Sequence, residues 1–327
     1  MPFAVIAKIL AFPLFFLPSA YILIMQLMQV AMVLIIAVLL LRMANIKNNI
    51  YRIMFLLAYI VSYPVLLFSI IVEQYIPSTF AAVFTIYFCV YRKKQNIAIL
   101  ALSCGVILTN AAIVPFATYT NKFLNWIKEM FKVILIFLTL CIFCGKVPTL
   151  IIAIDTVKIL LPFANIGMSS NSNINYDKLQ QFTHFIANCF IAPNTVEYTN
   201  IEVPVFRQAA PTTLSFTGVA LFTMAATSVF INRKRFIAKT YGLWGLLAII
   251  ILYVIGWGSP ENGMVLCTLY FGWAFFVLIF ILIERSLSKY KVIKPFIFIA
   301  GILTLLLINM SGIFDLIRFG MIYYPTG

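Results

Sequence analysis

The sequence predicts an all-α fold, a polytopic transmembrane helical bundle of about nine or ten spans plus interfacial helices. Of the 327 residues, 64% are hydrophobic and only 10% are charged, whereas soluble domains carry about 25% charged residues. The apolar residues form runs of about 20, the length that a helix needs to cross the hydrocarbon layer. Because only helices and closed barrels satisfy the backbone there, such long runs favour helices. A soluble protein is excluded, and residues 1–327 are expected to form a single membrane-embedded domain.

Ten apolar runs account for the predicted spans. They cover residues 20–42, 53–72, 76–91, 97–116, 131–145, 148–166, 214–231, 241–258, 264–283 and 295–313. The sixth run contains Asp155 and Lys158, so it could equally lie along the interface. Residues 2–18, which two prolines interrupt, are expected to form an interfacial helix. The basic and aromatic stretch 122–132 is also expected to form an interfacial helix. Its alternative role is to bind an anionic lipid headgroup or a polyprenyl phosphate.

The basic residues predict the orientation of the chain. Fifteen of the 23 Lys and Arg residues lie in loops on one side, and eight of the nine acidic residues, all but Glu284, lie on the other side or within spans. Loops rich in Lys and Arg face the cytoplasm. The fifteen basic residues in the loops of this side are Arg42, Lys47, Arg52, Arg92, Lys93, Lys94, Lys146, Arg233, Lys234, Arg235, Lys239, Arg285, Lys289, Lys291 and Lys294. The formal charge of +14 is therefore a topology signal, and the expected partner is the bilayer and no nucleic acid.

The long polar loop 164–213 is expected on the non-cytoplasmic side. It contains His184, the only histidine of the chain, on a stretch with helical apolar spacing, and Arg207 shortly before the seventh run. His184 could act as a base or bind a donor, although a structural role is the commoner one for a lone histidine. Arg207 could grip a phosphate with two parallel hydrogen bonds, or it could anchor the chain at the headgroups.

A positioned carboxylate is expected at the outer interface. Glu73 lies in Ile71–Pro77, between two apolar runs with almost no loop. A charged side chain at this depth costs free energy unless it pairs with an opposite charge or serves in binding or catalysis. Glu73 is therefore a candidate catalytic residue, and its alternative is an acid exposed to water at a helix turn. Gln74 and Tyr75 are candidate substrate-binding residues, although a tyrosine at an interface is often only an anchor.

A second outer turn carries a similar carboxylate. Glu261 and Asn262 lie in Gly256–Gly263, again between apolar runs. Glu261 is the second candidate catalytic residue and Asn262 a further substrate-binding candidate. Two such carboxylates could flank a sugar or share a divalent ion such as Mg or Mn, because these hard ions prefer oxygen ligands. The alternative is a solvated turn rich in Gly and Pro.

The order of several short segments carries a resemblance. These segments are Met1–Phe16, Ile24-Met25-Gln26 with the span that ends at Arg42, Tyr63–Ser69 followed by Glu73–Pro77, and Pro260-Glu261-Asn262 with Cys267–Phe271. Together they resemble the GT-C superfamily of integral membrane glycosyltransferases, in particular its little-characterised bacterial branch. The resemblance covers most of the chain, although each motif is short and apolar.

The resemblance implies transfer of a sugar from a polyprenyl-phosphate donor to a lipid-linked or cell-envelope acceptor, in the bacterial cytoplasmic membrane. GT-C enzymes characteristically place an acidic base in a first outer loop, before the segment with which this chain begins. We therefore expect the chain to lack the N-terminal span and that loop and to have little activity alone. It would then be a truncated product, a product of a wrongly assigned start, an inactive relative, or one half of a split enzyme whose partner chain supplies the missing segment. Turnover by the chain as it stands would instead make Glu73 the base. The alternative function is a non-enzymatic transporter or flippase of a lipid-linked glycan.

The predicted orientation can be tested by labelling. Single cysteines placed at residues 93 and 180 are expected to react from opposite sides of sealed vesicles, because the first lies in a basic loop and the second in the long outer loop. Labelling of both positions from one side would contradict this topology.

Overall fold

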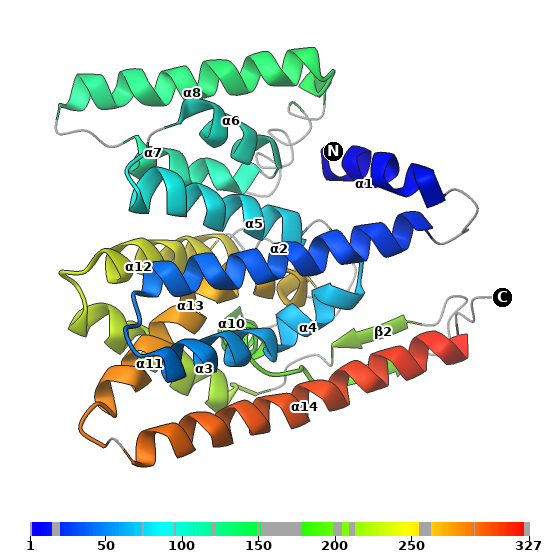
Figure 1. Ribbon diagram of the computed structural model, residues 1–327, viewed down its shortest axis with the longest axis vertical. Coiled ribbons are helices and arrows are strands. Elements are labelled where there is room, and N and C mark those ends of the chain that lie inside the picture. Colours follow the sequence, from blue (N-terminus) through cyan, green and yellow to red (C-terminus); the bar gives the residue numbers. More distant parts are fainter. Residues whose placement is uncertain are drawn as a thin grey trace. The chain divides into compact units, whose positions relative to one another are not determined.

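The computed structural model describes residues 2–14, 20–73, 75–94, 96–106, 108–118, 122–148, 151, 178–198, 205–208, 213–254, 263–290 and 292–323. Within these ranges the fold is an all-α helical bundle with one small hairpin of two strands (Figure 1). The chain divides into two compact units, of which unit 1 comprises residues 1–43 and 71–162 and unit 2 comprises residues 44–70 and 163–327. The expectation of a single domain stays a prediction.

Unit 1 is built from one long apolar helix and a group of shorter ones. Its elements are α1 (Pro2–Ala11), η1 (Phe12–Leu14), α2 (Ala20–Ala44, which ends one residue into unit 2), α5 (Tyr75–Thr85), η2 (Ile86–Tyr91), α6 (Ile97–Val106), η3 (Leu108–Ile113), α7 (Val114–Ala117) and α8 (Phe123–Phe143). Helix α6 packs against both α5 and α8.

Unit 2 surrounds one central helix. Its elements are α3 (Asn49–Ile60), α4 (Tyr63–Ile70), α10 (Lys178–Asn188), β1 (Thr195–Tyr198), β2 (Val205–Gln208), α11 (Phe216–Ile231), α12 (Phe236–Ala248), η4 (Ile249–Val254), α13 (Gly263–Ser286) and α14 (Ile293–Tyr323). Helix α13 contacts α3, α4, α10, α11 and α12. Its aromatic side chains fill the core, where the Phe276 ring lies 5.3 Å from the Phe55 ring and the Trp273 ring 5.3 Å from the Tyr241 ring.

Helices of spanning length and composition confirm the membrane character of the chain. Three helical segments, α2, residues 267–286 of α13 and α14, are long and apolar enough to cross a membrane, and the bent pair α3 and α4 would add a fourth. Four shorter apolar helical segments, Tyr75–Tyr91, Ile97–Val106, Phe216–Ile231 and Ala238–Tyr253, overlap the predicted runs 76–91, 97–116, 214–231 and 241–258. The apolar window of α13 is 78% buried, whereas that of α14 is 17% buried. Most of the apolar surface of α14 is therefore not covered by protein, as is expected of a helix that faces lipid.

Three predicted runs differ in the structure. The run 53–72 is not one helix but α3 and α4, which meet at an angle of 56°. The run 97–116 is divided into α6, η3 and α7, and the buried Asn110 side chain donates a hydrogen bond to the Ser103 carbonyl oxygen at 3.1 Å across the division. The interfacial stretch 122–132 and the run 131–145 form the single helix α8, because no Pro or Gly separates them. Run 148–166 lies largely outside the described residues.

A buried amide holds the bend between α3 and α4. Asn309, in the middle of α14, is completely buried. Its Nδ2 donates to the carbonyl oxygens of Val61 at 2.8 Å and of Phe190 at 2.7 Å. Its Oδ1 accepts from the backbone N–H of Ala192 at 2.8 Å. The Phe190 carbonyl also accepts from the Tyr63 N–H at 3.2 Å. One side chain thus joins the end of α3 and the segment after α10 to α14.

Replacement of this amide should destabilise the protein strongly. In Asn309→Leu, the Val61 carbonyl and the Ala192 N–H lose their amide partner, whereas the Phe190 carbonyl keeps the Tyr63 N–H, and a buried unpaired group costs about 1–3 kcal/mol. We expect the free energy of unfolding to fall by about 3 kcal/mol or more, measured by thermal or denaturant unfolding in detergent. Ser311→Ala, at an exposed position of the same helix, is the control. Equal stability of the two variants would show that Asn309 does not hold the bend.

Candidate functional site

The Glu73 turn has a defined anchor within unit 1. Glu73 lies between α4 and α5, and its side chain is exposed. Its backbone carbonyl oxygen accepts a hydrogen bond of 2.7 Å from Nε2 of Gln29 on α2. Gln29 is 1% exposed, and a buried amide must find partners because burial without them is costly. The turn is therefore tied to a long helix, and the carboxylate is presented at a fixed place.

The neighbours of Glu73 are described only in part. Tyr75 begins α5 and is half-buried, and its carbonyl oxygen accepts from the Thr79 hydroxyl at 2.8 Å. Gln74 lies outside the described residues. Sequence reasoning missed Gln29, although a polar residue inside the run 20–42 was a usable signal, since a polar group in a membrane helix needs a partner.

The second predicted carboxylate lies outside the described residues. Glu261 and Asn262 both fall in the gap between η4 and α13. The predicted cavity shared by Glu73 and Glu261 therefore stays a prediction. The same applies to a divalent ion: among the residues that the structure describes, no group of three or more His, Cys, Asp or Glu side chains lies close enough to hold a metal. Glu73 would need further oxygen ligands to bind Mg or Mn.

His184 lies on a helix, as its apolar spacing predicted. It belongs to α10, is half-buried, and its Nε2 lies 3.1 Å from the carbonyl oxygen of Thr213. Since a carbonyl only accepts hydrogen bonds, Nε2 is assigned the hydrogen. The preceding Thr183 hydroxyl accepts from the Ser215 N–H at 3.1 Å. Both contacts tie the start of α11 to α10, so they favour a structural role for His184. Its donor-binding role stays a prediction.

Helices α10 and α11 also approach each other closely near the start of α11. A Cβ atom at Gly218 would lie 1.7 Å from the Thr183 carbonyl oxygen, so only glycine fits at this crossing of α10 and α11.

Arg207 lies on β2, opposite Val196 of β1 in the antiparallel hairpin. Its phosphate-binding role stays a prediction.

The Glu73 anchor can be tested by hydrogen exchange. Gln29→Leu removes the donor to the Glu73 carbonyl and should release the turn, so backbone amides in residues 71–76 are expected to exchange faster than in the unchanged protein. Leu27→Ala, at an exposed position of the same helix, should leave this exchange unchanged. If both variants exchange alike, Gln29 does not fix the turn.

Comparisons with known proteins assign no role to the residues of the site. No protein-family model matches the chain, and no match is found among curated proteins or solved structures. The exposed Glu73 carboxylate and the turn that Gln29 anchors are therefore the structural basis for a functional proposal.

Proposed function

We propose that the chain is a GT-C-type membrane glycosyltransferase, which transfers a sugar from a polyprenyl-phosphate donor to a lipid-linked or cell-envelope acceptor. We place it in the bacterial cytoplasmic membrane. The observation that carries the proposal is the exposed Glu73 carboxylate, on a turn that buried Gln29 anchors. The resemblance of the surrounding segments to the GT-C superfamily supplies the reaction class.

The proposed chemistry needs one base at the outer interface. The acceptor hydroxyl oxygen attacks the anomeric carbon of the donor sugar, and the bond from that carbon to the phosphate oxygen breaks. In this proposal Glu73 acts in place of the acid that the resemblance expects in a first outer loop: it takes the hydroxyl proton, and polyprenyl phosphate leaves with the bonding electron pair. A divalent ion would stabilise the charge of the leaving phosphate. Glu261 is the residue that we propose to complete such a site or to contact the sugar.

A second candidate is a transporter or flippase for a lipid-linked glycan. The bent pair α3 and α4 supports it, because discontinuous membrane helices are typical of transport sites. Asn309 lies at the bend, and the carbonyl of Val61 at the end of α3 is bound there. Of the two acids that could mark a transport path, Asp315 is exposed on α14 and Asp155 lies outside the described residues.

The transferase proposal predicts a sharp loss in one variant. With a polyprenyl-phosphate sugar and a range of lipid acceptors, Glu73→Gln should lower the turnover of the reconstituted protein by about 100- to 10,000-fold, the usual effect of losing a general base. Glu197→Gln is the matched control, because Glu197 is exposed on β1 and is not a candidate site residue. It should retain turnover.

Two outcomes would contradict the transferase proposal. One is equal turnover of the Glu73→Gln and Glu197→Gln variants. The other is translocation of a fluorescent lipid-linked glycan across the vesicle membrane without any transfer of its sugar, which would establish the transport function instead. Wild-type protein is measured in both assays, so that loss of turnover is distinguished from loss of protein.

A further inference from the structure

Three of the basic loops meet at one pocket in unit 2. The pocket has a volume of about 650 Å³, within the range of about 300–1,000 Å³ that is usual for small-molecule sites. Its walls come from the loop after α2, the start of α3, the loop before α12, the end of α13 and the start of α14. The charged and polar side chains of the wall are Asn45, Lys47, Asn48, Tyr51, Arg235, Glu284, Arg285, Ser288 and Lys294.

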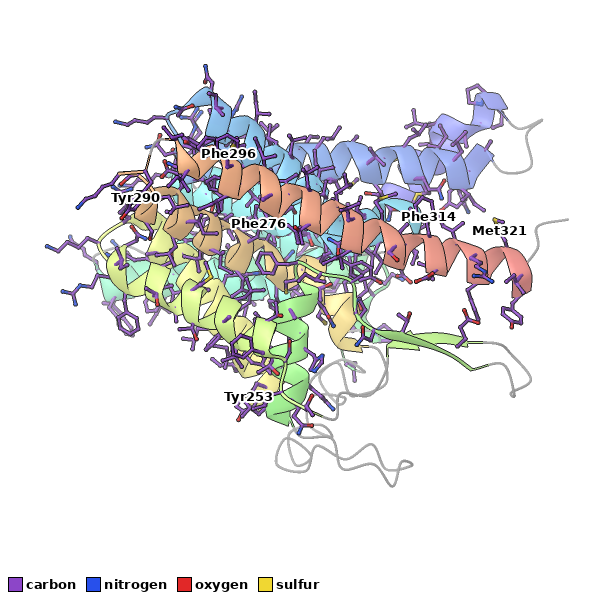
Figure 2. All side chains as sticks on the ribbon, turned by 90° about the horizontal axis from the view of Figure 1, so that it is seen from below. Tyr253, Phe276, Tyr290, Phe296, Phe314 and Met321 are labelled. Carbon is purple, nitrogen blue, oxygen red and sulfur yellow. The ribbon has the colours of Figure 1, made fainter. Side chains whose placement is uncertain are left out.

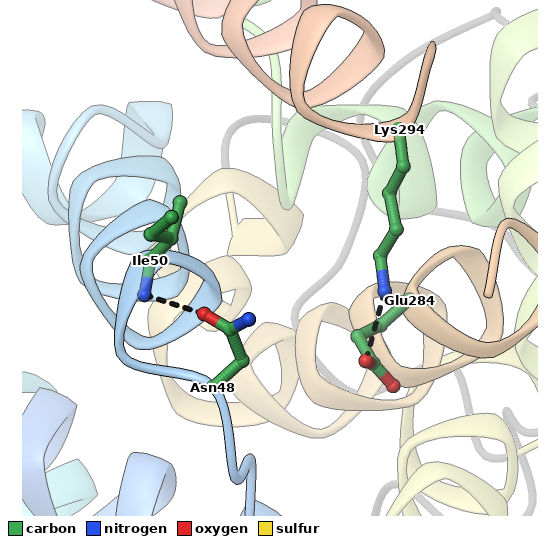
Figure 3. A network of polar contacts seen from close by, with 4 residues as sticks. All are labelled: Asn48, Ile50, Glu284 and Lys294. Carbon is green, nitrogen blue, oxygen red and sulfur yellow. Dashed lines mark hydrogen bonds and ion pairs between the residues drawn. The ribbon is translucent and has the colours of Figure 1, made fainter. Parts of the chain in front are cut away.

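One cation of the pocket is part of its structure. Lys294 is 4% exposed, and its Nζ lies 2.9 Å from Oε1 of Glu284 (Figure 3). The same Nζ lies 3.8 Å from the centre of the Tyr51 ring, a favourable cation–π contact. Lys294 therefore joins α14 to α13 and α3. Glu284, the single acid that the sequence places on the basic side, is used in this ion pair.

The other cations have no acidic partner among the described residues. Lys47 and Arg235 are exposed at the pocket. Arg285 is half-buried and donates through Nη1 to Oδ1 of Asn232, which leaves further N–H donors of its guanidinium available. The pocket thus carries three positive charges beyond the Lys294–Glu284 pair. Their mutual repulsion would be relieved by a bound anion.

The start of α3 does not supply the anion site by itself. Asn48 caps this helix, and its Oδ1 accepts from the Ile50 N–H at 2.8 Å (Figure 3). One of the free N–H groups of the helix start is therefore already used. Recognition of an anion must come chiefly from the side chains of Lys47, Arg235 and Arg285.

We propose that this pocket binds the phosphate group of an anionic ligand on the side of the basic loops. Arginine matches phosphate geometry, because its planar guanidinium can donate two parallel hydrogen bonds. The site is built from residues other than those of the Glu73 turn and does not depend on sugar transfer. Phosphate can come from a lipid headgroup or from a soluble ligand, and the surroundings favour the lipid.

The apolar surface beside the pocket is suited to acyl chains. Ile50 lines the pocket and is 58% exposed, and Phe296, next to the lining residue Pro295, is 68% exposed. Figure 2 shows Tyr290 and Phe296 near one end of α14 and Met321 at the other. A headgroup in the pocket would leave its acyl chains beside these exposed apolar side chains, whereas a soluble phosphate would not use them.

Binding can be measured with the purified full chain in detergent micelles and a fluorescent phosphatidylglycerol. Arg235→Gln is expected to weaken binding about tenfold, which corresponds to about 1.4 kcal/mol, and Arg285→Gln should act in the same direction. Arg233→Gln is the matched control, because Arg233 is exposed in the same loop but does not line the pocket. It should change the affinity less than twofold.

Competition identifies the source of the phosphate. Displacement of the lipid only by a large excess of inorganic pyrophosphate would support a lipid headgroup, whereas displacement by pyrophosphate at a concentration comparable with that of the lipid would support a soluble phosphate ligand in the same pocket. Equal lipid binding by the Arg235→Gln and Arg233→Gln variants, or no saturable binding of either probe, would overturn the proposal. Both substitutions lie on the surface, so size-exclusion profiles should confirm that folding is unchanged.

Discussion

The arrangement of unit 2 depends on the need to pair backbone groups in apolar surroundings. Where helices end or bend inside such a bundle, carbonyl and N–H groups lose their helical partners and water cannot replace them. Asn309 meets this need with both donors and its acceptor, and it does so from a helix whose other residues mostly face outward. The bend of α3 and α4 and the course of the chain after α10 are therefore linked to one amide.

The helices of the fold could be predicted because apolar runs of spanning length leave the backbone few alternatives. The runs at 20–42, 264–283 and 295–313 correspond to α2, α13 and α14. The bend in the run 53–72 could not be predicted in the same way. It involves Val61 and Asn309, which are 248 residues apart, and local composition carries no information about such a partner. The sequence shows Asn309 as a polar residue within an apolar run, but it does not show which backbone groups this side chain binds.

The candidate sites were predictable to different degrees. Acids are rare in this chain, so Glu73 was easy to identify, and the structure adds the contact with Gln29 that anchors its turn. The basic pocket was not predicted, because its side chains come from segments far apart in the sequence and were interpreted only as a topology signal. The two interpretations are compatible. Positive charge that orients loops toward one side of a membrane also concentrates cations where those loops meet.

The buried polar side chains can be separated by how completely their hydrogen-bonding groups are used. All the hydrogen-bonding atoms of the Asn309 amide have partners, so it is satisfied without a ligand. Gln29 differs, because Nε2 binds the Glu73 carbonyl while its buried Oε1 accepts no hydrogen bond from the described residues. A buried acceptor without a partner is costly and calls for an explanation. Gln29 therefore has an acceptor left over beside the turn that carries the proposed base, whereas the amide of Asn309 is fully used, which assigns Asn309 to the fold.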